Sequence, residues 1–180
     1  MHFNIDEIEL IHFADSRMTS RPPAFDFEKD GDKAEELSNV LYKKMLEWEG
    51  AGLSANQVGL PYRVFVVGNA EQKLTFFNPN ILGVSKEEDV LEEGCLSFPG
   101  FFLTLRRPRV VYIEWQNEKG ETQTGKFEGL GARVILHEYD HMEGINFTFH
   151  ASHFKLKWAL DKWKKKQLKL QRRNRNGKRI

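Results

Sequence analysis

The sequence contains very little cysteine and no long apolar run. Cys95 is the only cysteine among 180 residues, which excludes an intramolecular disulfide and indicates a reducing compartment. Residues 1–9 alternate polar and apolar types, so we expect neither a secretory signal nor a transit peptide, and no segment predicts a membrane span. Internal repeats and linkers rich in Gly, Ser or Pro are also missing. These absences predict one cytoplasmic domain with a sizeable core.

Acidic residues are scarce at one end of the chain. Residues 151–180 hold 12 of the 27 Lys and Arg residues but one of the 26 acids, Asp161, so this end carries a formal charge of about +11 and the remainder about −10. Three interpretations are open: a solvated helix that packs through an apolar stripe, a segment that binds a polyanion, and a segment that lies on a membrane surface. The stripe consists of Leu156, Leu160, Trp163 and Leu170. It is too short to favour the membrane.

Hydrophobic periodicity predicts three helices and six strands. The helices are expected at residues 30–50, 129–142 and 154–172, and the strands at 62–67, 74–77, 81–84, 103–105, 110–115 and 122–127. Asp30 or Asp32 can cap the start of the first helix and Gly50 can close its end. Residues 117–120 are typical of a hairpin turn, and Gly144 ends the second helix. This order predicts an α+β fold, in which largely antiparallel sheets pack around a central helix and a further helix follows at the C-terminus.

The most informative pattern is His137-Glu138-Tyr139-Asp140-His141. On a helix, residues four apart lie on one face, so His137 and His141 can bind the same cation. Glu138 can then reach a water on that cation without being a ligand. The alternative is an amphipathic helix with two histidines on one face. The spacing predicts a hydrolytic metal site that needs a third ligand from elsewhere.

Cys95 is the best candidate for the third ligand. One class of zinc peptidases continues the pattern with Gly-x-x-His, but here Phe147 follows Gly144 at that spacing. Another class needs a glutamate on a following helix, and only Asp161 lies in that direction. A thiolate and two imidazoles leave one coordination position open for water, as a catalytic site requires. A buried core cysteine is the competing interpretation, although Gly94 allows the backbone to approach a substrate closely.

Three separated motifs resemble those of the peptide deformylases and occur in the same order. They are Gly50-Ala51-Gly52-Leu53-Ser54-Ala55-Asn56-Gln57-Val58-Gly59, Glu93-Gly94-Cys95-Leu96-Ser97 and His137-Glu138-Tyr139-Asp140-His141. The resemblance covers about residues 8–150. Two positions depart from the family pattern. Ser54 stands where alanine is usual, and Leu136 stands where a glutamine usually precedes the first histidine.

The resemblance implies a metal-dependent hydrolase. The ligands of one divalent cation would be Cys95, His137 and His141. Iron(II) is favoured as the metal, zinc(II) is the second candidate, and nickel(II) or cobalt(II) would be substitutes. Glu138 would take a proton from the metal-bound water and deliver it to the leaving amine. The side-chain amide of Gln57 and the backbone N–H of Leu96 would donate to the oxyanion, although an amide that only stabilises its loop is the alternative for Gln57.

The substrate that the resemblance implies is the N-terminal formyl-methionine of nascent polypeptides. The methionine side chain would enter an apolar pocket lined by some of Phe98, Phe101, Phe102, Ile135 and Leu136. The backbone at Gly50, Gly52 and Gly94 would approach the extended peptide closely. Glu93 and Arg107 would form a structural ion pair outside the chemistry.

The resemblance also bears on the basic end of the chain. Residues 1–150 would form the catalytic part of a monomer, and residues 151–180 a basic helix or tail of the same domain. Bacterial family members use a C-terminal helix at the ribosome, so ribosomal RNA is the expected partner, and a membrane is not. A second hypothesis is a ribosome-binding protein without activity on the same fold. The intact metal-binding motifs, Gln57 and Glu138 argue against it.

Overall fold

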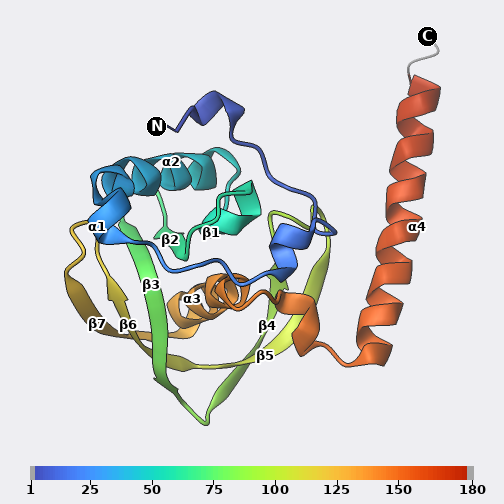
Figure 1. Cartoon of the computed structure of the whole chain (residues 1–180). Helices are drawn as coiled ribbons and strands as arrows, with labels where there is room; N and C mark the ends of the chain where they lie inside the picture. The colour runs from blue at the N-terminus through green and yellow to red at the C-terminus, as the bar shows by residue number, and fades with distance from the viewer. Residues whose placement is uncertain (1–2, 178–180) are drawn as a thin grey trace.

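The computed structural model describes residues 3–177 of the chain and, in the last helix, side chains up to residue 169. The helices are α1 (Phe27–Asp30), α2 (Ala34–Glu47), α3 (Gly129–Met142) and α4 (His153–Gly177). The strands are β1 (Gly52–Ser54), β2 (Val64–Gly68), β3 (Lys73–Val84), β4 (Glu88–Gly94), β5 (Phe102–Pro108), β6 (Val110–Gln116) and β7 (Thr122–Glu128). Short 3-10 helices complete the fold at Ile5–Glu7, Ser16–Thr19, Gly31–Lys33, Ala55–Val58 and Phe147–His150. The predicted α+β class is confirmed (Figure 1).

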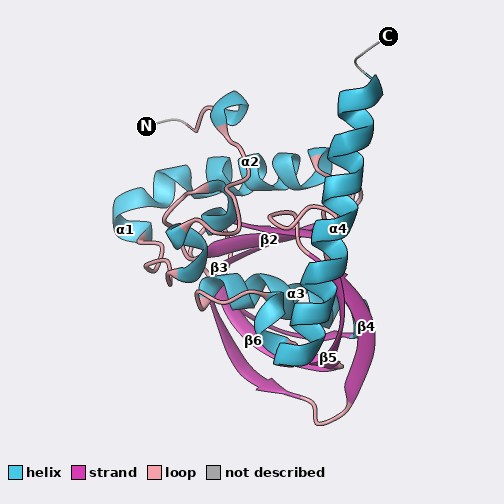
Figure 2. Ribbon diagram, turned by 90° about the vertical axis from the view of Figure 1, so that its right-hand side faces the viewer, coloured by secondary structure: helices cyan, strands magenta, loops and turns pink. Residues whose placement is uncertain are grey.

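The strands form two antiparallel sheets around α3. Five strands pair in the order β1-β2-β3-β6-β7, and β4 pairs with β5 in a separate hairpin. Successive side chains of β2 point to opposite faces: Val64 and Val66 pack in the cluster that contains α2, whereas Phe65 and Val67 pack in the cluster that contains α3. The sheet therefore carries α2 on one face and α3 on the other, and α3 lies enclosed between the sheets (Figures 1 and 2).

The start and the end of the first long helix differ from the prediction. Neither Asp30 nor Asp32 caps α2, whose N-cap position is Lys33 and carries no side-chain cap. Asp26 caps the short helix α1 that precedes it, because its carboxylate accepts the N–H groups of the first turn of α1. The Asp30 carboxylate is engaged by Lys33 instead. At the other end, Glu49 adopts the left-handed conformation that was expected of Gly50, with φ of 56°. Gly50 donates its N–H to the carbonyl of Met45 and continues toward β1.

The strand predictions were partly right. The hairpin turn at residues 117–120 is confirmed, because Asn117 donates its N–H to Glu121 O and Gly120 has a φ of 77°. The two strands predicted at 74–77 and 81–84 are one strand, β3, with an irregularity at Asn78, whose φ is 49°. Strands β1 and β4 were not predicted, since one has three residues and the other is mostly polar.

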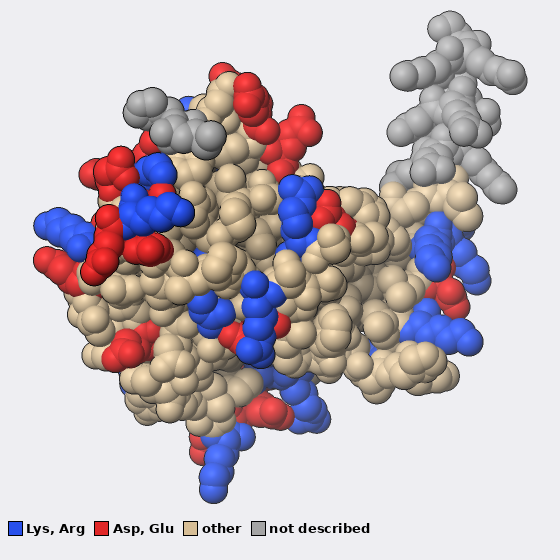
Figure 3. Space-filling model, in the orientation of Figure 1, with Lys and Arg blue, Asp and Glu red and all other residues tan. Residues whose placement is uncertain are grey.

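Helix α4 packs on the body through one narrow stripe. Leu156, Leu160 and Trp163 join the cluster that contains Phe98 and Phe101. The helix lies beside the β4–β5 hairpin (Figure 2), and lysine side chains project from it in Figure 3. Of the predicted basic tail, Lys178, Arg179 and the side chains of Leu170, Arg172, Arg173 and Arg175 lie outside the described part of the chain. No helix within residues 3–177 is long and apolar enough to cross a membrane.

Candidate metal centre

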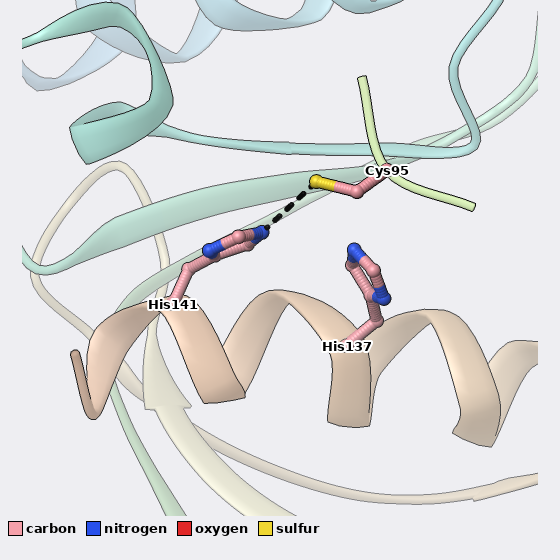
Figure 4. A group of neighbouring side chains, drawn as sticks. All are labelled: Cys95, His137 and His141. Carbon is pink, nitrogen blue, oxygen red and sulfur yellow. Dashed lines mark hydrogen bonds between the residues drawn. The ribbon is translucent and has the colours of Figure 1, made fainter. Parts of the chain in front are cut away.

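Three side chains from distant parts of the sequence converge at one face of α3. His137 and His141 project from this face, one helical turn apart, and Cys95 enters from the loop that follows β4 (Figure 4). The Cys95 Sγ lies 3.5 Å from His141 Nε2. One ligand atom from each of the three residues lies within 4.8 Å of the other two. A thiolate and two imidazoles at this spacing fit a divalent transition-metal ion such as zinc or iron, and they leave coordination positions for other molecules.

A buried ion network fixes the first histidine from behind. His137 Nδ1 lies 3.2 Å from Glu93 Oε2, which turns the other ring nitrogen toward the site. Arg107 donates to both oxygens of Glu93, at 2.9 and 3.0 Å, so the expected ion pair is present. Burial alone would raise the pKa of Glu93, but hydrogen bonds from His137 and Arg107 outweigh it and lower the pKa to about 2. Glu93 is therefore a permanent negative charge beneath His137.

The same network contains residues that the motifs did not reveal. Arg133 donates to Glu93 Oε1 at 2.7 Å. Asp140 Oδ2 accepts a hydrogen bond from Arg107 at 2.7 Å and lies 2.8 Å from His150 Nε2. Arg133 precedes His137 by one helical turn, a spacing that was readable in the sequence. His150 had no such signal, since its partners come from α3 and β5.

Glu138 is the unpaired acid of the site. Its side chain is buried and its Oε2 atom has no hydrogen-bond partner among the described residues. Burial raises the pKa of Glu138 to about 7, against the charge of His137 and the nearby hydroxyl of Ser54, which lower it. Strand β1 passes so close that a Cβ atom on Gly52 would lie 2.6 Å from Glu138 Oε1. The missing side chain of Gly52 therefore makes room for this carboxylate.

Gln57 contacts the metal centre from the 3-10 helix Ala55–Val58, which follows β1. Its Nε2 lies 3.3 Å from Cys95 Sγ and 3.5 Å from Ser97 Oγ, while its Oε1 accepts hydrogen bonds from Ser54. The amide therefore both stabilises its own loop and presents an N–H group to the centre.

A cleft of about 510 Å³ opens onto this centre. Of the residues predicted to contact a substrate, Gly50, Gly52, Gly94, Leu96, Phe98 and Phe102 line it. Leu136, which was predicted to contact the substrate, is not among the residues that line the cleft. Leu136 is adjacent to His137, so the helix turns it about 100° away, into the core that α3 shares with the sheet. Phe101 and Ile135 are core residues as well. The apolar wall is supplied instead by Leu130 and Val134.

The comparisons with known proteins agree with this geometry. The family model described as polypeptide deformylase matches residues 9–157. The chain belongs to the peptide deformylase family. The peptide deformylase of Christiangramia forsetii is 40% identical over 149 residues, which cover 73% of this chain and 76% of that protein. That of Thermotoga petrophila is 38% identical over 117 residues, which cover 65% of this chain and 71% of that protein.

Solved deformylases share the whole fold. The crystal structure of the peptide deformylase from Thermus thermophilus superposes with a TM-score of 0.81 at 27% identity, covering 91% of this chain and 97% of that one. The Synechococcus elongatus enzyme, in complex with actinonin, gives 0.80 at 28% identity and covers 90% and 88%. Peptide deformylases are metallohydrolases that deformylate nascent chains. The peptidase alternative lacks its third ligand among the described residues, because the phenyl ring of Phe147 carries no ligand atom and Asp161 is exposed on α4.

Proposed function

We propose that this deformylase hydrolyses the N-terminal formyl group of formyl-methionyl polypeptides with Glu138 as its proton carrier. The observation that carries the proposal is the unpaired, buried oxygen of Glu138 beside Cys95, His137 and His141. A buried carboxylate without a partner is costly unless something else occupies its free oxygen. Its raised pKa, about 7, suits a group that accepts a proton from water and returns it to the leaving amine.

The three ligands would hold one divalent cation, with iron(II) favoured, zinc(II) as the second candidate, and nickel(II) or cobalt(II) as substitutes. Such a cation activates water near neutral pH and polarises a carbonyl oxygen. The chain supplies the remaining groups. Gln57 Nε2, held 3.3 Å from Cys95 Sγ, and the backbone N–H of Leu96 would donate to the oxyanion of the tetrahedral intermediate. Glu93 would keep His137 oriented as a ligand.

The cleft suits an extended peptide with an apolar first side chain. Strand β1 lies at the edge of the five-stranded sheet, so its free edge around Gly52 can pair with a peptide as an added strand. Gly50 and Gly94 line the cleft without side chains that would fill it. Phe98, Leu130 and Val134 give it an apolar side for methionine. The formyl group itself is too small to contribute most of the binding energy.

Further proposals concern the surroundings of the enzyme. We place it in the cytoplasm as a monomer, with residues 1–150 as the catalytic part and residues 151–180 as an appended basic segment of the same domain. The lysines of α4 support docking to ribosomal RNA, because exposed cationic side chains on one helix attract phosphate groups. This position would bring the cleft near emerging formylated chains.

The decisive test is formate release from a formyl-Met peptide under anaerobic conditions, with iron(II) or nickel(II) bound. Glu138→Gln should keep the metal and lose about 10²–10⁴-fold in kcat, whereas Cys95→Ser should lose metal and activity together. Glu128→Gln, an exposed glutamate just before the same helix, is the matched control and should behave like the parent. A parent that holds one metal and releases no formate would overturn the proposal in favour of a silent site.

A further inference from the structure

Ser54 is one of the two positions at which the chain departs from the deformylase motif, and it lies inside the site. It is the last residue of β1 and it is fully buried. Its backbone N–H donates to Gln57 Oε1 at 2.9 Å, and its hydroxyl donates to the same oxygen at 2.8 Å. A carbonyl oxygen has two lone pairs. Ser54 therefore occupies both acceptor positions of the Gln57 side chain.

These two bonds decide which way the Gln57 amide points. A backbone N–H can only donate, so the atom that faces it must be Oε1 and the opposite atom must be Nε2. In that orientation Nε2 lies 3.3 Å from Cys95 Sγ and 3.5 Å from Ser97 Oγ. Turning the amide over would leave the backbone N–H of Ser54 facing an NH2 group, without an acceptor in a fully buried place, and the hydroxyl would lose the acceptor to which it donates.

We propose that the Ser54 hydroxyl is a positioning residue, which holds the side-chain amide of Gln57 with its N–H groups toward the oxyanion of the reaction. This inference rests on the proposed function for its catalytic consequence, but the orientation of Gln57 can be measured without activity. The substitution Ser54→Ala keeps the backbone N–H donor and removes the hydroxyl donor. The amide should then rock about the remaining bond, and the population aligned with the oxyanion should fall.

Kinetics of the metal-loaded enzyme test the catalytic consequence. Ser54→Ala should lower kcat about threefold to tenfold, the effect of one lost hydrogen bond of ordinary strength, with KM within about twofold because the hydroxyl does not line the cleft. In a Gln57→Ala background the same change should cost clearly less than in the parent, and the remainder would come from the influence of the Ser54 hydroxyl on Glu138, as a double-mutant cycle would show. Ser38→Ala is the matched control, since Ser38 is an equally buried serine that hydrogen-bonds Thr75 and Glu118 far from the site. It should lower the Tm and leave kcat unchanged.

Nuclear magnetic resonance of the zinc-loaded protein tests the orientation itself. The side-chain NH2 signals of Gln57, identified by their loss in Gln57→Ala, should be separate and slow to exchange with solvent in the parent. In Ser54→Ala they should exchange about fivefold faster, again the effect of one hydrogen bond. Unchanged signals would overturn the proposal, as would an equal loss of kcat from Ser54→Ala with and without Gln57. If the parent shows these signals but releases no formate, the proposed function fails while the role of Ser54 in orienting Gln57 stands.

Discussion

Helices α3 and α4 both carry many charged side chains and use them in opposite ways. In α3, nine of 14 residues are buried, and five of the nine are ionisable: Arg133, His137, Glu138, Asp140 and His141. Helix α4 instead exposes its lysines and even large apolar residues, with Phe154 at 81% and Trp158 at 62% exposure. One helix lies enclosed by the sheets and the other stands beside them (Figure 1).

The two helices differ in whether their charged side chains contact other protein side chains or solvent. Arg133, His137, Asp140 and His141 each contact a side chain of the β4–β5 hairpin or of the loop between its strands. Two buried atoms of these side chains have no hydrogen-bond partner among the described residues, Glu138 Oε2 and His141 Nδ1, and Glu138 is the acid of the two. Burying a charge is costly, so a fold keeps one unpaired only where a ligand or reactant completes it. In α4, Lys155 donates to Thr104 O and Lys162 lies over the Trp158 ring. The other described lysines are exposed to solvent, which leaves them available to a partner at little cost.

Among substitutions that leave Cys95 and the side chains of α3 intact, the largest expected effect on catalysis comes from filling the space that Gly52 leaves for Glu138. In Gly52→Ala the new Cβ would lie 2.6 Å from Glu138 Oε1, so the carboxylate must move. A misplacement of about 1 Å in a catalytic group costs about 10²-fold, and we expect that loss in kcat for formate release. Gly131→Ala adds a methyl group to α3 where nothing lies within 4 Å. It should keep full activity and gain about 0.5–1 kcal/mol in stability. A Gly52→Ala enzyme with the parental kcat would show that Glu138 is not held in place by β1.

The largest effect on stability is expected at Arg107. Arg107→Met leaves the carboxylates of Glu93 and Asp140 in the core without their cation. Breaking a buried ion network by removing one partner costs about 3–5 kcal/mol, which urea unfolding of the metal-free chain would measure. Arg106→Met, on the exposed face of the same strand, should change stability by about 0.5 kcal/mol or less. Equal effects of the two substitutions would remove the distinction between paired and solvated charge.

Local sequence patterns identified what depends on local structure. The bounds of α3 and the β6–β7 turn were readable because helix periodicity and the turn residues each lie within a few positions of one another. Strand β4 was missed because its acidic residues have low strand propensity, and its pairing with β5 decides its conformation. Capping by Asp26 was missed because several acids nearby were equally suitable.

The site divides in the same way. The ligands and Glu138 belong to short motifs, so their grouping could be predicted before the fold was known. His150 and the role of Ser54 could not, because each depends on a partner that the fold brings into contact. Leu136 shows the reverse case, because it is next to His137 along the chain but packs in the core shared with the sheet and does not line the cleft.

A smaller effect is expected where α4 meets the body. The Trp163 ring packs edge-on against Phe101, with ring centroids 5.7 Å apart, and its Nε1–H donates to Pro99 O at 3.1 Å. Trp163→Ala should lower the free energy of unfolding by about 2 kcal/mol, less than a fully buried tryptophan would. Trp158→Ala, on the exposed side of the same helix, should change it by about 0.5 kcal/mol or less. Urea unfolding distinguishes the two, and equal losses would mean that α4 packs on the body through more than one stripe.

The smallest effect on catalysis is expected from the lysines of α4, although they should matter most for a partner. Lys164 and Lys165 are exposed and do not line the cleft, so Lys164→Glu with Lys165→Glu should leave kcat/KM for a short formyl-Met peptide within about twofold. If α4 docks on ribosomal RNA, the same double variant should bind ribosomes more weakly. The slope of log K against log salt concentration should also become shallower, by about one for each phosphate contact that is lost.

The control for this prediction changes the net charge by the same amount at a different place on the protein. Lys29→Glu with Lys43→Glu makes the same change in charge at exposed positions in α1 and α2. Ribosome binding by co-sedimentation should be unaffected in that variant if the position of the lysines on α4 decides the contact. Equal weakening in both variants would mean that overall charge alone attracts the protein, and α4 would then be a solvated helix with no docking surface. In that case the contrast with α3 would be sharper, since Lys164 and Lys165 would serve solvation alone, whereas the buried charges of α3 have partners in the fold.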